Sequence, residues 1–184
     1  MIAAQARTLP LFAQDASGAL LSQDRRYRYR LWRAWGDIAR RCVFVGLNPS
    51  TADEEDDDVT ITRCIGIARG WGFGALDMVN LFALRSTNPK GLLLDADPVG
   101  PDNDSALGGV FGRAARVVWC WGDYQGAVKR LCVSRSAAVV FLAGAVVPLS
   151  GSLPEYGSLG RTKSGAPRHP SRLAYATAFV REVV

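Results

Sequence analysis

The sequence contains one histidine and two asparagines at the ends of apolar runs, and these side chains are its main candidates for chemistry. His169 stands in Pro-Arg-His-Pro-Ser, where Pro170 suits the first turn of a helix that we expect to begin there. The partial positive charge of a helix N-terminus disfavours imidazolium, so the ring should be neutral. A neutral imidazole N–H can stabilise a developing anion. The alternative is a histidine that only caps the helix or lies on the surface.

Asn48 and Asn80 each end a run that is typical of a buried strand. Asn48 precedes Pro49, which stops the first run because proline cannot donate to a ladder. The Asn48 amide can orient a water molecule but accepts a proton poorly. The Asn80 amide can offer donors and an acceptor to the edge of a heterocycle. The alternatives are an ordinary Asn-Pro turn and a polar residue at a strand end.

Six consecutive carboxylates occupy residues 53–58, directly after the Asn48 segment. The formal net charge is +5, and without these six acids it would be +11, so a basic protein carries one acidic loop. A basic excess indicates an anionic partner. The acidic loop is most simply a solvated loop, and we expect no metal and no other cofactor. A divalent-cation site is the weaker alternative, with the candidate ligands Asp53, Asp57 and Asp58.

Arginines alternate with apolar or aromatic residues over residues 26–31, which predicts a half-buried strand. One interpretation is an edge strand that the arginines protect from edge-to-edge pairing. The other is a basic stripe beside aromatic rings that follows a phosphate backbone.

Strand-like and helix-like segments alternate along the chain. We expect strands over residues 24–35, 40–47, 75–81, 116–121 and 137–142, and helices over 59–71, 103–113, 123–133 and from 169 onward. This alternation predicts an α/β fold: a single-domain, three-layer α/β/α arrangement with a central, mainly parallel four-stranded sheet, plus an N-terminal β-hairpin or edge strand. Residues 1–22 would form an N-terminal segment, either partly disordered or that hairpin, and residues 23–184 the single domain.

The composition, 48% hydrophobic and 21% charged, is ordinary for a soluble protein. The apolar run 137–149 is too short to span a bilayer, and no basic-then-apolar leader opens the chain. We therefore expect a cytoplasmic protein, with no membrane partner, that is a monomer. The four cysteines form no C-x-x-C pair and lie in apolar segments, so we expect buried thiols.

In their order along the chain, these segments resemble the uracil-DNA glycosylase superfamily. The motifs are Gly46-Leu47-Asn48-Pro49-Ser50, Asn80 after the next strand, Trp121-Gly122, and His169 to Leu173. The resemblance implies hydrolysis of the N-glycosidic bond of a damaged or deaminated base flipped out of DNA. Asn48 would place the water, Asn80 would bind the base, and His169 would stabilise the leaving anion. Arg172 or Leu173 would fill the gap left in the duplex.

The same resemblance implies a base-binding set beside these residues: Gly46, Leu47, Pro49, Ser50, Phe82, Trp121 and Ser171. From charge and loop position we add candidates for phosphate contacts: Arg85, Arg161, Lys163 and Arg168. Asn48 stands where the fastest uracil enzymes have Asp, which implies slow turnover. Ser50 replaces the tyrosine that excludes thymine, which implies a less selective pocket.

A second resemblance covers nearly the whole chain. The matching segments are similar to the domain of unknown function 1643 family: Tyr27-Arg28-Tyr29, Gly46 to Asp53, Arg63 to Gly66, Val79 to Phe82, Gly100 to Asp104 and Pro167 to Pro170. This family brings no established activity.

Two other functions are compatible with the same residues. The chain could be a non-catalytic nucleic-acid-binding protein, which would bind an oligonucleotide and leave no abasic site. It could also be a metal-dependent enzyme acting on a free nucleotide, with the metal held by the acidic loop.

Overall fold

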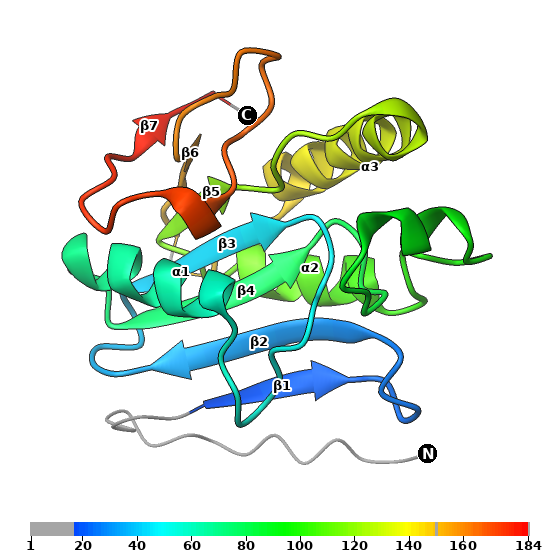
Figure 1. Cartoon of the computed structure of the whole chain (residues 1–184). Helices are drawn as coiled ribbons and strands as arrows, with labels where there is room; N and C mark the ends of the chain where they lie inside the picture. Colours follow the sequence, from blue (N-terminus) through cyan, green and yellow to red (C-terminus); the bar gives the residue numbers. More distant parts are fainter. Residues whose placement is uncertain (1–16, 150, 184) are drawn as a thin grey trace.

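A computed structural model of the chain describes residues 17–149 and 151–183. Expectations about residues 1–16 lie outside the described part. Within it, one seven-stranded sheet runs through the molecule in the order β1-β2-β4-β3-β5-β6-β7 (Figure 1). The strands are β1 (Ser17–Leu21), β2 (Arg28–Ala34), β3 (Arg41–Gly46), β4 (Ala75–Asn80), β5 (Arg116–Trp119), β6 (Glu155–Ser158) and β7 (Val180–Arg181).

The sheet is mixed. β4, β3, β5 and β6 pair in parallel, whereas β1–β2, β2–β4 and β6–β7 pair antiparallel. The expectation of an α/β fold is confirmed, but the mainly parallel four-stranded sheet is wrong. Within residues 17–149 and 151–183, three of the six strand pairings are antiparallel. The N-terminal hairpin exists as β1 and β2, and it belongs to the same sheet.

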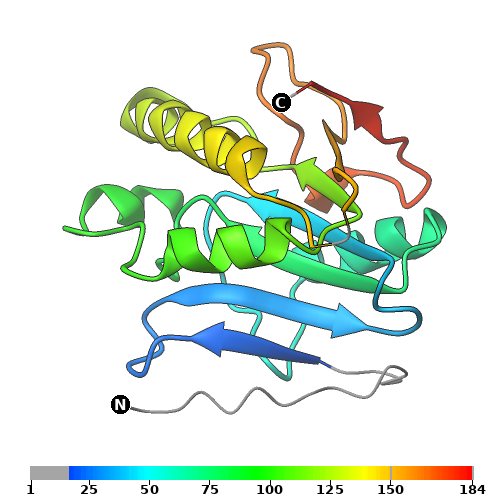
Figure 2. The same cartoon turned by 180° about the vertical axis from the view of Figure 1, so that it is seen from behind.

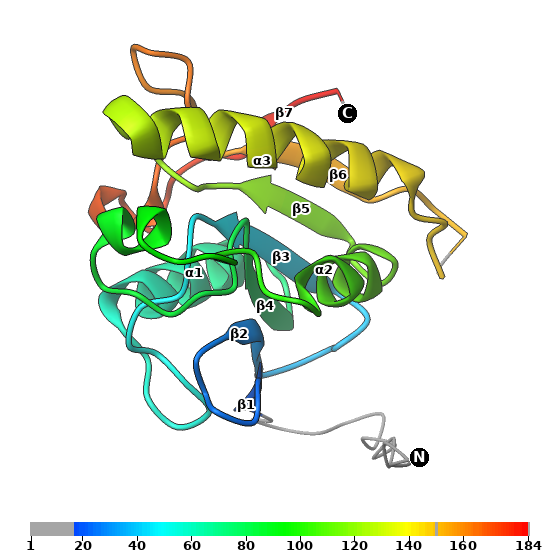
Figure 3. The same cartoon turned by 90° about the vertical axis from the view of Figure 1, so that its right-hand side faces the viewer.

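Helices cover both faces of the sheet. α1 (Val59–Gly70) lies on one face, and α2 (Asn103–Phe111) and α3 (Gly126–Ala145) lie on the other (Figures 2 and 3). Every residue of β3 and of β4 is buried, because these strands run between the two layers. The α1 side packs Phe44 and Met78, and the opposite side packs Val45 and Val79. In the part of the chain that the structure describes, the remaining regular segments are two 3-10 turns, η1 (Pro89–Leu93) and η2 (Pro170–Arg172).

The predicted strand over residues 137–142 is wrong, since this segment lies inside α3. A short apolar run cannot be assigned by periodicity alone. In α3 the spacing of the buried side chains is helical: Val128, Cys132, Val139 and Ala143. The fourth parallel strand is instead β6, which the sequence placed in a long loop because it is short and contains Gly157.

The predicted helix beginning at residue 169 is also wrong. Only η2, a three-residue turn, follows His169. The chain then extends to β7, which pairs antiparallel with β6. The apolar residues of this segment do not form one buried face, because Leu173 is 6% exposed whereas Val180 is 47% exposed.

β2 is an interior strand, so the edge-strand interpretation of the arginine segment is wrong. The register between β1 and β2 shifts between Leu20, which pairs with Arg30, and Leu21, which pairs with Arg28. The extra residue, Tyr29, forms a bulge, and bulges redirect side chains. Arg30 consequently bonds to Asp77, whereas Arg28 bonds to Asn80, whose side chain lies on the opposite face of β4. The basic stripe is thereby split between two faces of the sheet.

No helix in the described residues combines the length and the apolar character needed to cross a bilayer.

Candidate functional site

A cavity of about 170 Å³ opens at the carboxyl ends of β3 and β4. Parallel α/β sheets bind ligands at this end of their strands. The cavity brings together Asn48, Asn80 and His169, which are remote in sequence. The other residues that line it come from β2, β3, β4, α1 and the adjoining loops: Arg28, Gly46, Leu47, Ser50, Asp58, Thr60, Ile61, Met78, Ser86, Thr87 and Tyr124.

Asn48 is held by the loop that follows β4. Its Nδ2 donates to the carbonyl oxygen of Ser86 at 2.7 Å and to that of Pro49 at 3.0 Å. Both amide hydrogens are therefore occupied, and Oδ1 remains as the acceptor. This arrangement suits an amide that holds a water molecule through one of the water's hydrogens.

Asn80 is the last residue of β4 and is 1% exposed. Its Oδ1 accepts from Nη2 of Arg28 at 3.3 Å. A Cβ atom on Gly46 would come within 2.7 Å of Asn80 Nδ2, so glycine is needed where β3 passes this amide. Asn80 therefore has its oxygen occupied and its N–H groups beside the cavity.

Arg28 is a cavity residue that the sequence did not identify. It is 2% exposed, and its Nη1 donates to the carbonyl oxygen of Ala52 at 2.7 Å. Its Nε is buried and has no hydrogen-bond partner among the described residues. Burial lowers the pKa of Arg28 to about 10, and the charge of Asp58 opposes this change. Nothing in the sequence marks the bulge at Tyr29. The sequence therefore could not show that Arg28 faces the cavity while Arg30 does not.

His169 is partly buried and has a defined tautomer. The backbone N–H of Ser171 donates to Nδ1 of His169 at 3.3 Å, and the Ser171 hydroxyl lies 2.9 Å from the same atom. Because an N–H can only donate, Nδ1 is the acceptor and the neutral ring carries its proton on Nε2. Burial lowers the pKa of His169 below 6.5, and Asp58 opposes this effect. Burial, and not the dipole of a long helix, thus favours the neutral ring.

Asp58 joins the cavity to α1. Its side chain caps the helix by accepting from the backbone N–H of Ile61 at 2.9 Å. An N-cap carboxylate in this position stabilises the helix and places one negative charge beside the cavity.

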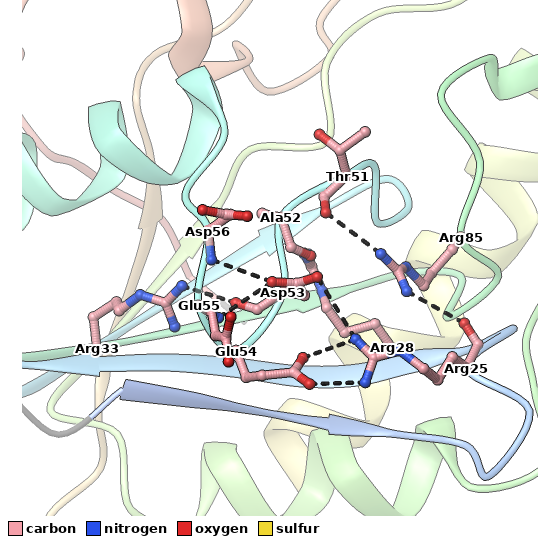
Figure 4. A network of polar contacts seen from close by, with 10 residues as sticks. All are labelled: Arg25, Arg28, Arg33, Thr51, Ala52, Asp53, Glu54, Glu55, Asp56 and Arg85. Carbon is pink, nitrogen blue, oxygen red and sulfur yellow. Dashed lines mark hydrogen bonds and ion pairs between the residues drawn. The ribbon is translucent and has the colours of Figure 1, made fainter.

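Arg25 and Arg33, from the β1–β2 loop and β2, form ion pairs with three acidic side chains of the loop, and Figure 4 shows these two arginines beside it. The three acids are Asp53, Glu54 and Asp57. Glu54 accepts from both Arg25 Nη atoms, at 2.7 and 3.0 Å, and this contact lowers the pKa of Glu54 to about 2. Arg33 binds Asp57 at 2.7 Å and donates to the carbonyl oxygen of Asp53 at 2.8 Å. The loop is therefore fixed against β2, and much of its charge is offset within the molecule.

The metal alternative finds no support in this arrangement. No cluster of three or more His, Cys, Asp or Glu side chains suited to a metal occurs in the described residues. The proposed ligands are used otherwise, since Asp57 pairs with Arg33 and Asp58 caps α1. All four cysteines are buried free thiols, and burial raises the pKa of each.

The other predicted base-binding residues divide into two groups. Gly46, Leu47 and Ser50 line the cavity. Pro49 supports it through its carbonyl, and Ser171 through His169. Phe82 is 1% exposed in the core on the other face of the sheet and does not line the cavity. Trp121 packs on Trp119, with ring centroids 5.8 Å apart, and lines a neighbouring cavity of about 210 Å³ beside α3.

A groove of about 450 Å³ lies on another side of His169. The exposed Arg168 and Arg172 line it. Lys163 is also exposed nearby in sequence, whereas Arg161 binds Glu182. Arg85 joins two loops by donating to the carbonyl oxygens of Arg25 and Thr51, each at 3.4 Å.

Leu173 also borders the groove but is 6% exposed and belongs to the core on the α1 side. It cannot fill a gap in a duplex without leaving that core, which is a physical objection to its predicted role. Arg172 has no such constraint.

Comparison with known proteins gives one match. Residues 28–171 match the model of a family described as "Protein of unknown function (DUF1643)". No curated protein and no solved structure matches the chain.

Proposed function

The chain belongs to the DUF1643 family, and because that family's description assigns no activity, we propose a function from the cavity: hydrolytic release of a single-ring base from a nucleic acid. The proposal keeps the likeness of the Asn48, Asn80 and His169 motifs to uracil-DNA glycosylases. The observation that carries it is the convergence of these three side chains on one cavity of about 170 Å³.

The size of the cavity favours one ring. An engineered cavity of about 150 Å³ holds a benzene molecule, so a volume of about 170 Å³ has room for one pyrimidine. Sugar and phosphate would then lie outside. A base in a duplex would have to be flipped, at roughly a few kcal/mol of lost stacking.

The hydrogen-bonding groups favour a ligand that gains negative charge. Asn80 offers N–H donors and His169 offers Nε2–H, whereas Asn48 keeps an acceptor for water. In hydrolysis of an N-glycosidic bond, the C1′–N bond breaks with both electrons leaving on the base, and water adds to C1′ and loses a proton, which the departed base anion takes up. His169 would stabilise the departing base anion, and Asn48 would hold the attacking water.

The groove lined by Arg168 and Arg172 supports a nucleic acid as the source of the base. It lies beside His169, so a strand could run along it with one base turned into the cavity. Guanidinium groups bind phosphate through several donors and fix the register of the strand.

The test uses oligonucleotides that carry uracil or mismatched thymine, followed by alkaline strand scission, and an oligonucleotide that carries hypoxanthine, a two-ring base, should be cut more slowly than either. We expect scission by the wild type, and a loss of about 100-fold or more in His169→Ala, which removes a preorganised donor. Asn48→Ala should also lose most of the rate. Asn88→Ala is the matched control, because Asn88 is exposed and only caps η1.

Absence of scission of every substrate by the wild type contradicts the proposal. Equal rates in His169→Ala, Asn48→Ala and the wild type contradict the assigned roles. Retention of a labelled oligonucleotide without an abasic site would instead support the binding-protein alternative.

A further inference from the structure

The buried contact between Arg28 and Asn80 has a consequence for ligand choice. We propose that Arg28 is a positioning residue that locks the Asn80 amide with its N–H groups toward the cavity, so that the cavity selects bases with a carbonyl oxygen over bases with an amino group at that edge. This inference deepens the proposed function and rests on the cavity receiving a base.

The lock follows from the chemistry of the guanidinium group, which has only donors. Nη2 of Arg28 lies 3.3 Å from Asn80 Oδ1. Rotating the amide by half a turn would place N–H against N–H, with both groups buried. Leaving buried donors unpaired is costly, so the carboxamide is restricted to one of its two orientations.

Arg28 is itself held in place. Nη1 donates to the Ala52 carbonyl oxygen at 2.7 Å, and the side chain is 2% exposed. No carboxylate forms an ion pair with Arg28 in residues 17–149 and 151–183, unlike Arg33, which binds Asp57. A buried guanidinium without a direct counter-ion is expensive. A role in orienting a group that a ligand needs accounts for the presence of Arg28 at this buried position.

The opposite side of Asn80 is shaped by Gly46. Because a Cβ atom there would lie 2.7 Å from Nδ2, β3 leaves the amide nitrogen just enough room. Asn80 therefore meets a ligand as a donor. A 4-oxo pyrimidine such as uracil can accept from it, whereas the 4-amino group of cytosine would oppose it with another donor.

The experiment measures the dissociation constants of free uracil and free cytosine by titration of the isotope-labelled protein, following the amide spectrum. We expect the wild type to bind uracil at least about tenfold tighter, the ratio that follows from one lost buried hydrogen bond. In Arg28→Met the Asn80 amide can rotate, so the dissociation constants of cytosine and uracil should differ by no more than about threefold.

Arg33→Met is the matched control. Arg33 is 8% exposed and donates to the carbonyl oxygen of Asp53, the residue after Ala52, but it does not line the cavity. It should keep the wild-type ratio. If Arg28→Met does not fold, Arg28→Gln is the second variant. Because a glutamine amide offers both a donor and an acceptor, it satisfies either orientation of the Asn80 amide, and the ratio of the two dissociation constants should still fall at least threefold.

A wild type that binds neither base, or binds both equally, overturns the inference. A folded Arg28 variant with the wild-type ratio also overturns it. The outcome is separable from hydrolysis: a selectivity that depends on Arg28, without base release from oligonucleotides, supports the lock and contradicts only the proposed reaction.

Discussion

The backbone N–H of Ser171 donates to Nδ1 of His169 at 3.3 Å, which leaves the proton of the neutral imidazole on Nε2. A three-residue turn, η2, is sufficient to fix this tautomer. Burial lowers the pKa of the ring, so the neutral donor persists to a lower pH than in a free histidine. The local geometry of one turn thus determines which proton His169 can offer.

The His169 pKa predicts a pH dependence of stability. Since the folded-state pKa lies below the unfolded value near 6.5, the unfolded chain binds more protons in the window between the two values. The contribution of His169 to the free energy of unfolding is therefore fully present above pH 6.5, and it is lost as the pH falls through the folded-state pKa. Denaturant unfolding from pH 7 to pH 5 should show a steeper loss for the wild type than for His169→Asn, and parallel curves would contradict this expectation.

Gly46→Ala should damage the cavity. The added Cβ would lie 2.7 Å from both Asn80 Nδ2 and Met78 Cε, so these groups must move. We expect a loss of about 1–3 kcal/mol in unfolding free energy from overpacking, together with loss of base binding. Gly108→Ala is the control, because its Cβ would meet nothing within 4 Å and α2 should gain about 0.5–1 kcal/mol. Unchanged base binding in Gly46→Ala would show that Asn80 does not contact the base.

Substitutions at Leu173 and Arg172 should have different effects, the first on stability and the second on nucleic-acid binding. Leu173→Ala removes a core side chain and should cost about 2–5 kcal/mol of unfolding free energy. Arg172→Ala should leave stability nearly unchanged and reduce the salt dependence of oligonucleotide binding, the slope of log K against log salt becoming shallower by about 0.7–0.9. A salt slope identical to that of the wild type would remove Arg172 from the contact surface.

Among the carboxylates in the described part of the fold, Asp77 should be the one whose substitution lowers the free energy of unfolding most. It is fully buried in the sheet and binds Arg30 at 2.8 Å and Arg41 at 3.0 Å. Asp77→Asn leaves two mostly buried guanidinium groups without a counter-ion and should cost about 3–5 kcal/mol. Asp104→Asn, at an ion pair whose carboxylate side chain is 62% exposed, should cost no more than about 1 kcal/mol. Comparable losses in the two variants would refute this account of Asp77.

Much of the site could be predicted because strand ends are local signals. The apolar runs before Asn48 and Asn80, and the proline after Asn48, indicate where polar side chains leave the sheet. The Asp58 cap of α1 is equally local, since capping depends on neighbouring residues. That His169 would lie beside Asn48 and Asn80 was predicted in another way, from the resemblance in the order of motifs along the chain.

The errors arose where long-range pairing decides the structure. An apolar run could be strand or helix, and residues 137–142 are part of α3, whose buried residues recur at helical spacing. β6 is too short to show a pattern, and β7 exists through pairing with β6. Arg28 was missed because the register shift that turns it to the cavity involves β1, a partner the local sequence does not reveal.

The most direct test of the central claim is to locate a bound base on the protein. Free uracil titrated into the isotope-labelled wild type should shift the side-chain amide signals of Asn48 and Asn80 and the ring signals of His169. Signals from the neighbouring cavity around Trp121 and Cys132 should stay in place. Shifts confined to that second cavity, or no shifts at any concentration, would contradict the account.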